Sequence, residues 1–72
     1  MSNYNGKTFG QIIREKREKR GWSQDVLSQK LTISRDVISH WEKEHTQPRL
    51  DSLMLVADVF ECTIDELVGR TL

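Results

Sequence analysis

Residues 22–43, WSQDVLSQKLTISRDVISHWEK, decide the fold of this chain. Ser23 can cap a helix over residues 24–30, and Ser34 can cap another from residue 35 to about residue 43, because a serine hydroxyl accepts a hydrogen bond from a free N–H group at a helix start. Only three residues, 31–33, lie between them. Two short helices joined by so short a turn must cross at a steep angle.

The second of these helices separates its apolar from its polar side chains. With a rotation of about 100° per residue, Val37, Ile38 and Trp41 point inward. Four polar side chains point outward: Arg35, Asp36, Ser39 and His40. A helix pair of this geometry is a helix-turn-helix, whose second helix can enter a DNA major groove about 12 Å wide. Arginine can bind guanine, aspartate can accept from cytosine, and serine and histidine can bind several base edges, so we expect this helix to read base pairs.

Capping signals predict three more helices around this pair. Thr8 begins the first with a capping box, Pro48 precedes a helix over about residues 50–60, and Thr63 begins a last helix over residues 64–68. No segment alternates apolar and polar residues for long enough to predict a strand. The apolar stripes predict one core made of Phe9, Ile13, Leu27, Leu31, Val37, Ile38, Trp41, Leu53, Val56, Ala57, Phe60, Ile64 and Leu67. The predicted fold is therefore an all-α, compact five-helix domain.

Composition excludes several classes of protein. A chain of 72 residues with 36% hydrophobic residues can build one small core but rarely a deep cleft, and no nucleophile–base pair or phosphate loop is present, so we predict no enzyme, no cofactor and no small-molecule substrate. The single cysteine, Cys62, excludes an internal disulfide and a Cys-x-x-Cys zinc site, and we predict no metal site. No apolar run is long enough to span a membrane.

The charge is unevenly distributed although the formal net charge is zero. Residues 1–20 carry a net +4 and residues 51–72 a net −4. A polyanion would be attracted to the N-terminal part of the chain. The alternative is that each part is only the solvated surface of a helix.

From about Thr8 to Val68 the sequence resembles the Cro/lambda-repressor-like helix-turn-helix family, also called the XRE family. The markers, in order, are Arg17, Gly21-Trp22-Ser23-Gln24, Leu27, Ser34-Arg35-x-x-Ile38-Ser39, Trp41-Glu42, Pro48, Leu53, Ala57 and Thr63-x-x-Glu66-Leu67. The resemblance implies a lambda-repressor-like domain in a dimeric, DNA-binding transcription regulator from the cytoplasm of a bacterium or from a phage. Within the chain we expect a flexible N-terminal arm over 1–7, the DNA-binding domain over 8–69 and a C-terminal tail over 70–72.

The expected DNA-binding residues combine this resemblance with the outward face of the helix. They are Gln24, Ser34, Arg35, Asp36, Ser39, His40, Arg14 and Lys43. The resemblance also implies a structural ion pair between Arg17 and Glu42, with phosphate binding by Arg17 as the alternative. The family often has glycine at three turn positions where this chain has Thr32, Glu44 and Glu61. We expect the local turns to differ there.

An apolar surface near the acidic C-terminal part predicts a symmetric homodimer interface formed by Leu55, Val59, Val68 and Leu72, together with Met54. The alternative is a set of scattered surface apolar residues. A dimer would hold two recognition helices about 34 Å apart over an inverted repeat. The predicted function is a sequence-specific double-stranded DNA-binding regulator, a repressor. The alternative is a protein-interaction module, such as an antitoxin or anti-repressor, that uses the same helical surface to bind a protein partner.

Overall fold

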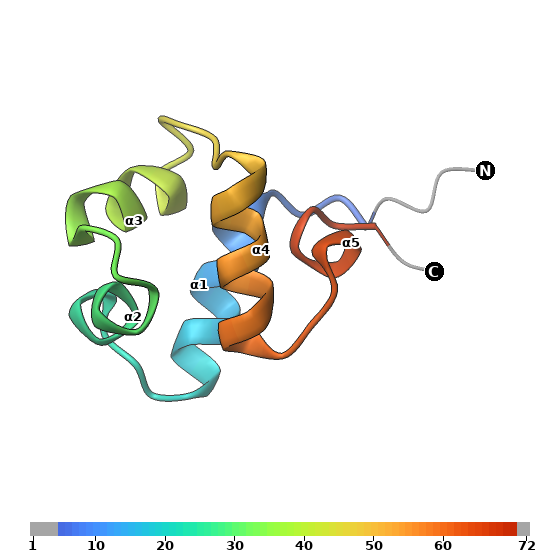
Figure 1. Cartoon of the computed structure of the whole chain (residues 1–72). Coiled ribbons are helices and arrows are strands. Elements are labelled where there is room, and N and C mark those ends of the chain that lie inside the picture. Colours follow the sequence, from blue (N-terminus) through green and yellow to red (C-terminus); the bar gives the residue numbers. More distant parts are fainter. Residues whose placement is uncertain (1–4, 71–72) are drawn as a thin grey trace.

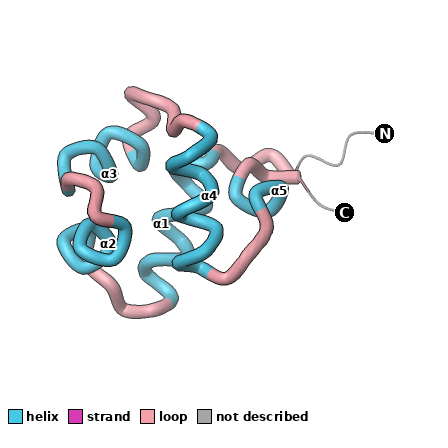
Figure 2. Tube along the Cα trace, in the orientation of Figure 1, coloured by secondary structure: helices cyan, strands magenta, loops and turns pink. Residues whose placement is uncertain are grey.

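The predicted all-α architecture is confirmed. The computed structural model describes residues 5–70. Within that range the chain forms five helices: α1 (Phe9–Lys19), α2 (Gln24–Leu31), α3 (Arg35–Glu42), α4 (Leu50–Phe60) and α5 (Ile64–Leu67). Figure 1 shows α2 and α3 together on one side of the molecule, α4 crossing α1 in the middle, and α5 on the opposite side. The tube in Figure 2 shows that short loops connect consecutive helices and that α2 and α3 form a compact pair.

Hydroxyl side chains begin four of the five helices, as the capping signals predict. Thr8 accepts a hydrogen bond from the backbone of Gln11, whose side chain accepts one from Thr8 in return. The other three caps are Ser23, Ser34 and Thr63, before α2, α3 and α5. Arg49 precedes α4 and makes no side-chain hydrogen bond to its end. The helix starts are therefore set by local sequence.

All five helices end in the same motif, in which a residue takes the left-handed conformation and the next N–H returns to a carbonyl five residues earlier. Gly21 and Gly69 occupy the left-handed position after α1 and α5, with φ of 69° and 84°. Thr32, Glu44 and Glu61 occupy it after α2, α3 and α4, with φ of 56°, 64° and 53°. The returning bonds join Trp22 to Arg17, Ile33 to Ser28, His45 to His40, Cys62 to Ala57, and Arg70 to Asp65.

The expectation that these turns would differ from the family pattern is therefore wrong. The returning hydrogen bonds hold the backbone in the conformation that glycine favours, although three side chains carry a Cβ there. A left-handed non-glycine residue costs roughly 1–2 kcal/mol. Thr32 is the most strained of the three because its side chain is β-branched.

The core lies between the helices and follows the predicted stripes, except that it includes Ile12, which the predicted set omits, and excludes Val37. Phe9, Ile12, Ile13, Leu27, Leu31, Ile38, Trp41, Val56, Ala57, Phe60 and Leu67 are its buried apolar residues. Leu53, Ile64 and Cys62 pack against it while partly exposed. The prediction that Val37 points inward is wrong, because it lies on the flank of α3 and is 38% exposed. Ile38 and Trp41 make the core contacts of that helix instead.

Gly10 allows α1 to approach α3 closely. A Cβ at Gly10 would overlap the carbonyl oxygen of Trp41 and would lie 3.1 Å from Cα of Glu42. Beside this contact, the rings of Phe9 and Trp41 meet edge to face, with centroids 5.5 Å apart. Because Gly10 has no Cβ, the backbone of α3 can lie directly against α1.

A second cluster joins the C-terminal ends of α1 and α4. The guanidinium of Arg20 donates to the carbonyl of Phe60 at 3.1 Å and lies over the rings of both Trp22 and Phe60. Those two rings are stacked, with centroids 5.7 Å apart, and the ammonium of Lys30 lies 4.6 Å from the Trp22 centroid. Trp22 is therefore a packing residue. None of the five helices in residues 5–70 has the length and apolar character needed to cross a membrane.

Candidate nucleic-acid interface

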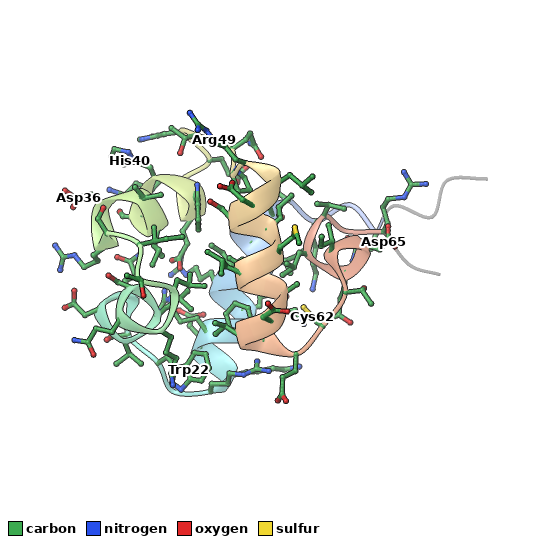
Figure 3. The ribbon with its side chains drawn as sticks, in the orientation of Figure 1. Trp22, Asp36, His40, Arg49, Cys62 and Asp65 are labelled. Carbon is green, nitrogen blue, oxygen red and sulfur yellow. The ribbon has the colours of Figure 1, made fainter. Side chains whose placement is uncertain are left out.

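The outward face of α3 carries four of the eight predicted DNA-binding residues. Asp36 and His40 are exposed and project away from the rest of the domain (Figure 3). Arg35 and Lys43 are also exposed, while Ser39 is half-buried. The structure therefore brings four of the eight predicted residues to a single short helix at the edge of the molecule, with Lys43 directly after it (Figure 1).

The remaining predicted residues on α2 and before α3 have partners within the protein. Gln24, the first residue of α2, donates from its side-chain amide to Glu42 at 3.0 Å, so the amide group is held at the start of that helix. The hydroxyl oxygen of Ser34 accepts from the backbone N–H of Val37 at 3.3 Å, and its hydroxyl hydrogen can still donate to a phosphate. Exposed N–H groups at such a helix start also favour an anion.

The predicted pair of Arg17 and Glu42 connects α1 to the end of α3. Two hydrogen bonds of 2.8 and 2.9 Å join the guanidinium to the two carboxylate oxygens, and a third, also of 2.9 Å, runs from Arg17 to the carbonyl of Trp22. The two side chains are 11% and 5% exposed. The hydrogen bond to Glu42 raises the pKa of Arg17 above its ordinary value. Each of the three nitrogens of the guanidinium therefore donates one hydrogen bond within the protein.

Arg35 lies close to an acidic residue of the neighbouring helix. Its Nε is 3.7 Å from the carboxylate of Asp25 in α2, and the two side chains are 58% and 67% exposed. An ion pair so exposed contributes little to stability. Arg35 can therefore leave Asp25 and bind a base or phosphate at little cost.

His45 is a residue of this surface that the predicted set leaves out. Its ring lies 5.8 Å from that of His40, and its backbone N–H donates to the carbonyl of His40 at 2.9 Å. The signal in the sequence is weak because the contact depends on the left-handed turn at Glu44. Within residues 5–70 no cluster of three or more potential metal ligands occurs.

The basic residues near the N-terminus are mostly paired with acids. Arg14 lies 3.3 Å from Glu18 in the same helix, and Lys7 lies 2.8 Å from Glu15. Lys16 pairs with Glu66 of α5 and thereby lowers the pKa of that carboxyl group. Glu15 and Glu18 are already counted in the net +4 of residues 1–20, so only the pairs of Lys16 with Glu66 and of Arg17 with Glu42 reduce it, from +4 to +2. The predicted attraction of a polyanion to this part is therefore weaker than the sequence suggests.

Of the four predicted dimer residues, two lie on α4 and one directly follows α5. On α4, Leu55 is 47% exposed and Val59 is half-buried. Val68, which follows α5, is half-buried, and Leu72 lies outside the described residues. Two other apolar side chains of α4, those of Leu50 and Met54, are also exposed.

Comparison with known families identifies the fold and its class. A family model described as helix-turn-helix matches residues 13–67. The chain belongs to the XRE-type helix-turn-helix family. The helix-turn-helix itself consists of α2, the turn at Thr32 and α3.

Named relatives of this helix-turn-helix domain are regulators. It is 34% identical over 58 residues to the HTH-type transcriptional regulator AnsR of Bacillus subtilis. The aligned region covers 81% of this chain and 50% of AnsR. The domain spans about half the length of this regulator. Among solved structures, it is similar to the P22 c2 repressor of a Salmonella phage in complex with a synthetic operator, with a TM-score of 0.81 and 29% sequence identity. The match covers 86% of this chain and 94% of the repressor chain. It is also similar to SinR of Bacillus subtilis in complex with DNA, with a TM-score of 0.77, 26% identity, and coverage of 83% and 97%.

Proposed function

We propose that this protein is a sequence-specific double-stranded DNA-binding transcriptional regulator that represses by occupying its operator. The observation that carries the proposal is the exposed polar face of α3, which projects from a domain whose relatives are regulators and whose structural neighbours include repressor–DNA complexes. Gly10 and the pair of Arg17 and Glu42 fix α3 from behind. A reading helix held in this way has a defined orientation in the groove.

The roles of the surface residues follow from their chemistry. On α3, Arg35 would bind guanine O6 and N7, Asp36 would accept from cytosine N4, and Ser39 and His40 would contact neighbouring base edges. Phosphates would be bound by Gln24 and Ser34 at the two helix starts and by the cations of Arg14 and Lys43. Base contacts would give specificity and phosphate contacts would give register.

The proposal includes a homodimer. Leu55, Val59, Val68 and Leu72 would form the interface with a second copy. The exposure of Leu55 and of its neighbour Met54 supports this use of the surface. Two-fold symmetry would then place the reading helices on half-sites about 10 base pairs apart, so the operator would be an inverted repeat.

In vitro selection from random duplexes tests the proposal. We expect enrichment of an inverted repeat with that spacing, and a weaker affinity of His40→Ala for the enriched duplex. Asp58→Ala, on the exposed surface of α4, is the matched control and should bind as the wild type does. Failure to enrich any sequence would contradict the proposal, whereas a copurifying protein with no preference among duplexes would favour the protein-interaction module. A cytoplasmic location and the absence of enzymatic activity are part of the proposal.

A further inference from the structure

Val37 is an apolar side chain on the reading helix that the core does not use. It is the third residue of α3, it is 38% exposed, and it belongs neither to the buried core nor to the residues packed against it. Its neighbours along the helix, Asp36 and His40, are exposed as well. Val37 therefore borders the surface assigned above to the major groove.

Helix stability does not explain a valine at this position. Valine has a lower helix propensity than alanine because its β-branched side chain loses rotamer freedom. Single exposed apolar residues are common on protein surfaces, so exposure alone carries no functional meaning. The position at the border of a polar reading face, next to His40, is what calls for an explanation.

Thymine offers one apolar group in the major groove, the methyl at C5, and small apolar side chains recognise it by contact. Arg35, Asp36 and His40 address hydrogen-bonding edges, which leaves Val37 as the apolar reader of this helix. We propose that Val37 packs on the C5 methyl of a thymine in each half-site and so favours thymine over cytosine there. The inference rests on the proposed function, because it requires α3 to lie in the major groove.

Val26 is a closely matched control. It is the third residue of α2, it is 36% exposed, and its backbone N–H donates to the capping Ser23 at 3.1 Å. Val37 makes the corresponding hydrogen bond to Ser34 at 3.3 Å. The same change to alanine at both sites therefore has the same local effect on a helix but removes methyl groups from different surfaces.

The test combines protein and DNA substitutions. Each thymine of the selected half-site is replaced in turn by deoxyuridine, which removes the methyl and keeps the base pair. Dissociation constants are then measured for the wild type, Val37→Ala and Val26→Ala, with circular dichroism melts as the check on folding. For the wild type and for Val26→Ala we expect about fourfold weaker binding at one thymine, the effect of one lost methyl contact. Val37→Ala should bind the thymine and uracil duplexes equally.

Two outcomes would overturn the inference without touching the proposed function. In the first, Val37→Ala keeps the full sensitivity to uracil; in the second, the wild type binds the selected duplex but is insensitive to uracil at every position. Failure of the wild type to prefer any unmodified duplex would overturn the proposed function and the inference together. Binding to the unmodified duplex thus distinguishes the two failures.

Discussion

Arg17 and Glu42, which are 25 residues apart in the sequence, join α1 to the last turn of α3 through two charge-assisted hydrogen bonds. Glu42 also accepts from Gln24 at the start of α2. One buried carboxylate thus connects the first three helices. Because α3 ends at this carboxylate, the pair determines the orientation of the helix that we expect to enter DNA.

Breaking this pair should be strongly destabilising. We expect Arg17→Ala and Glu42→Ala each to lower the free energy of unfolding by about 3 kcal/mol, because either change leaves one buried charge without its partner. The double variant should lose less than the sum of the two. Urea unfolding of all three variants measures this coupling. The exposed pair of Arg14 and Glu18 is the control and should show a coupling below about 1 kcal/mol. Additive losses at Arg17 and Glu42 would contradict the prediction.

The left-handed turn between α2 and α3 should tolerate glycine better than threonine. Thr32 has a φ of 56°, and we expect Thr32→Gly to raise the free energy of unfolding by about 1 kcal/mol, since the strain that it relieves slightly exceeds the backbone entropy that glycine costs. Gly21→Ala, at the equivalent position after α1, should lower stability. Thermal melts of both variants check the sign of each effect. A destabilised Thr32→Gly would mean that the threonine side chain stabilises the turn in another way.

Gly10→Ala should damage both folding and DNA binding. Its methyl group would meet backbone atoms of Trp41 and Glu42, which can yield only if α3 moves, at a cost of about 1–3 kcal/mol. Urea unfolding gives the loss of stability, and the affinity for the selected duplex gives the effect of the displaced helix. Lys19→Ala, on the exposed surface of α1, is the control and should change stability by less than about 0.5 kcal/mol. Unchanged stability of Gly10→Ala would contradict the close packing described above.

Lys43 should contribute to affinity without contributing to specificity. If it binds a phosphate, Lys43→Ala should lower the slope of log affinity against log salt concentration by about 0.9 per subunit. The loss of affinity should be similar for the selected and for unrelated duplexes, because phosphates carry no sequence information. Titrations at several salt concentrations, with Lys19→Ala as the control, measure the slope. A loss confined to the selected duplex would instead assign Lys43 to a base.

The helices could be predicted from sequence because local signals set them. Serine and threonine caps begin four of them, and their hydrogen bonds span only three residues. The position of Val37 could not be predicted in this way, because a helical rotation gives the direction of a side chain but not the width of the surface that the neighbouring helices cover. Val37 lies at the edge of that surface.

The backbone conformation of the turns and the partners in the ion pairs also could not be predicted from the sequence alone. A positive φ at Thr32 is locally unfavourable. The turn adopts it because α2 packs against α3, and the residues of the turn alone do not reveal that packing. Lys16 pairs with Glu66, 50 residues away, so the net charge of residues 1–20 overstates the charge available to a ligand. The predicted pair of Arg17 and Glu42 was accessible only through resemblance to a family.

The binding of Arg35→Ala to DNA tests the role of α3 most directly. Fluorescence anisotropy would compare the wild type and this variant on the selected duplex and on a scrambled duplex of the same composition. We predict that the wild type strongly prefers the selected duplex, and that Arg35→Ala loses about tenfold or more of its affinity for it while binding the scrambled duplex almost as the wild type does, because one bidentate arginine–guanine contact contributes about 1–3 kcal/mol of discrimination. Equal binding of the wild type to both duplexes, or an Arg35→Ala variant that keeps the full preference, would show that α3 does not read the sequence through this residue.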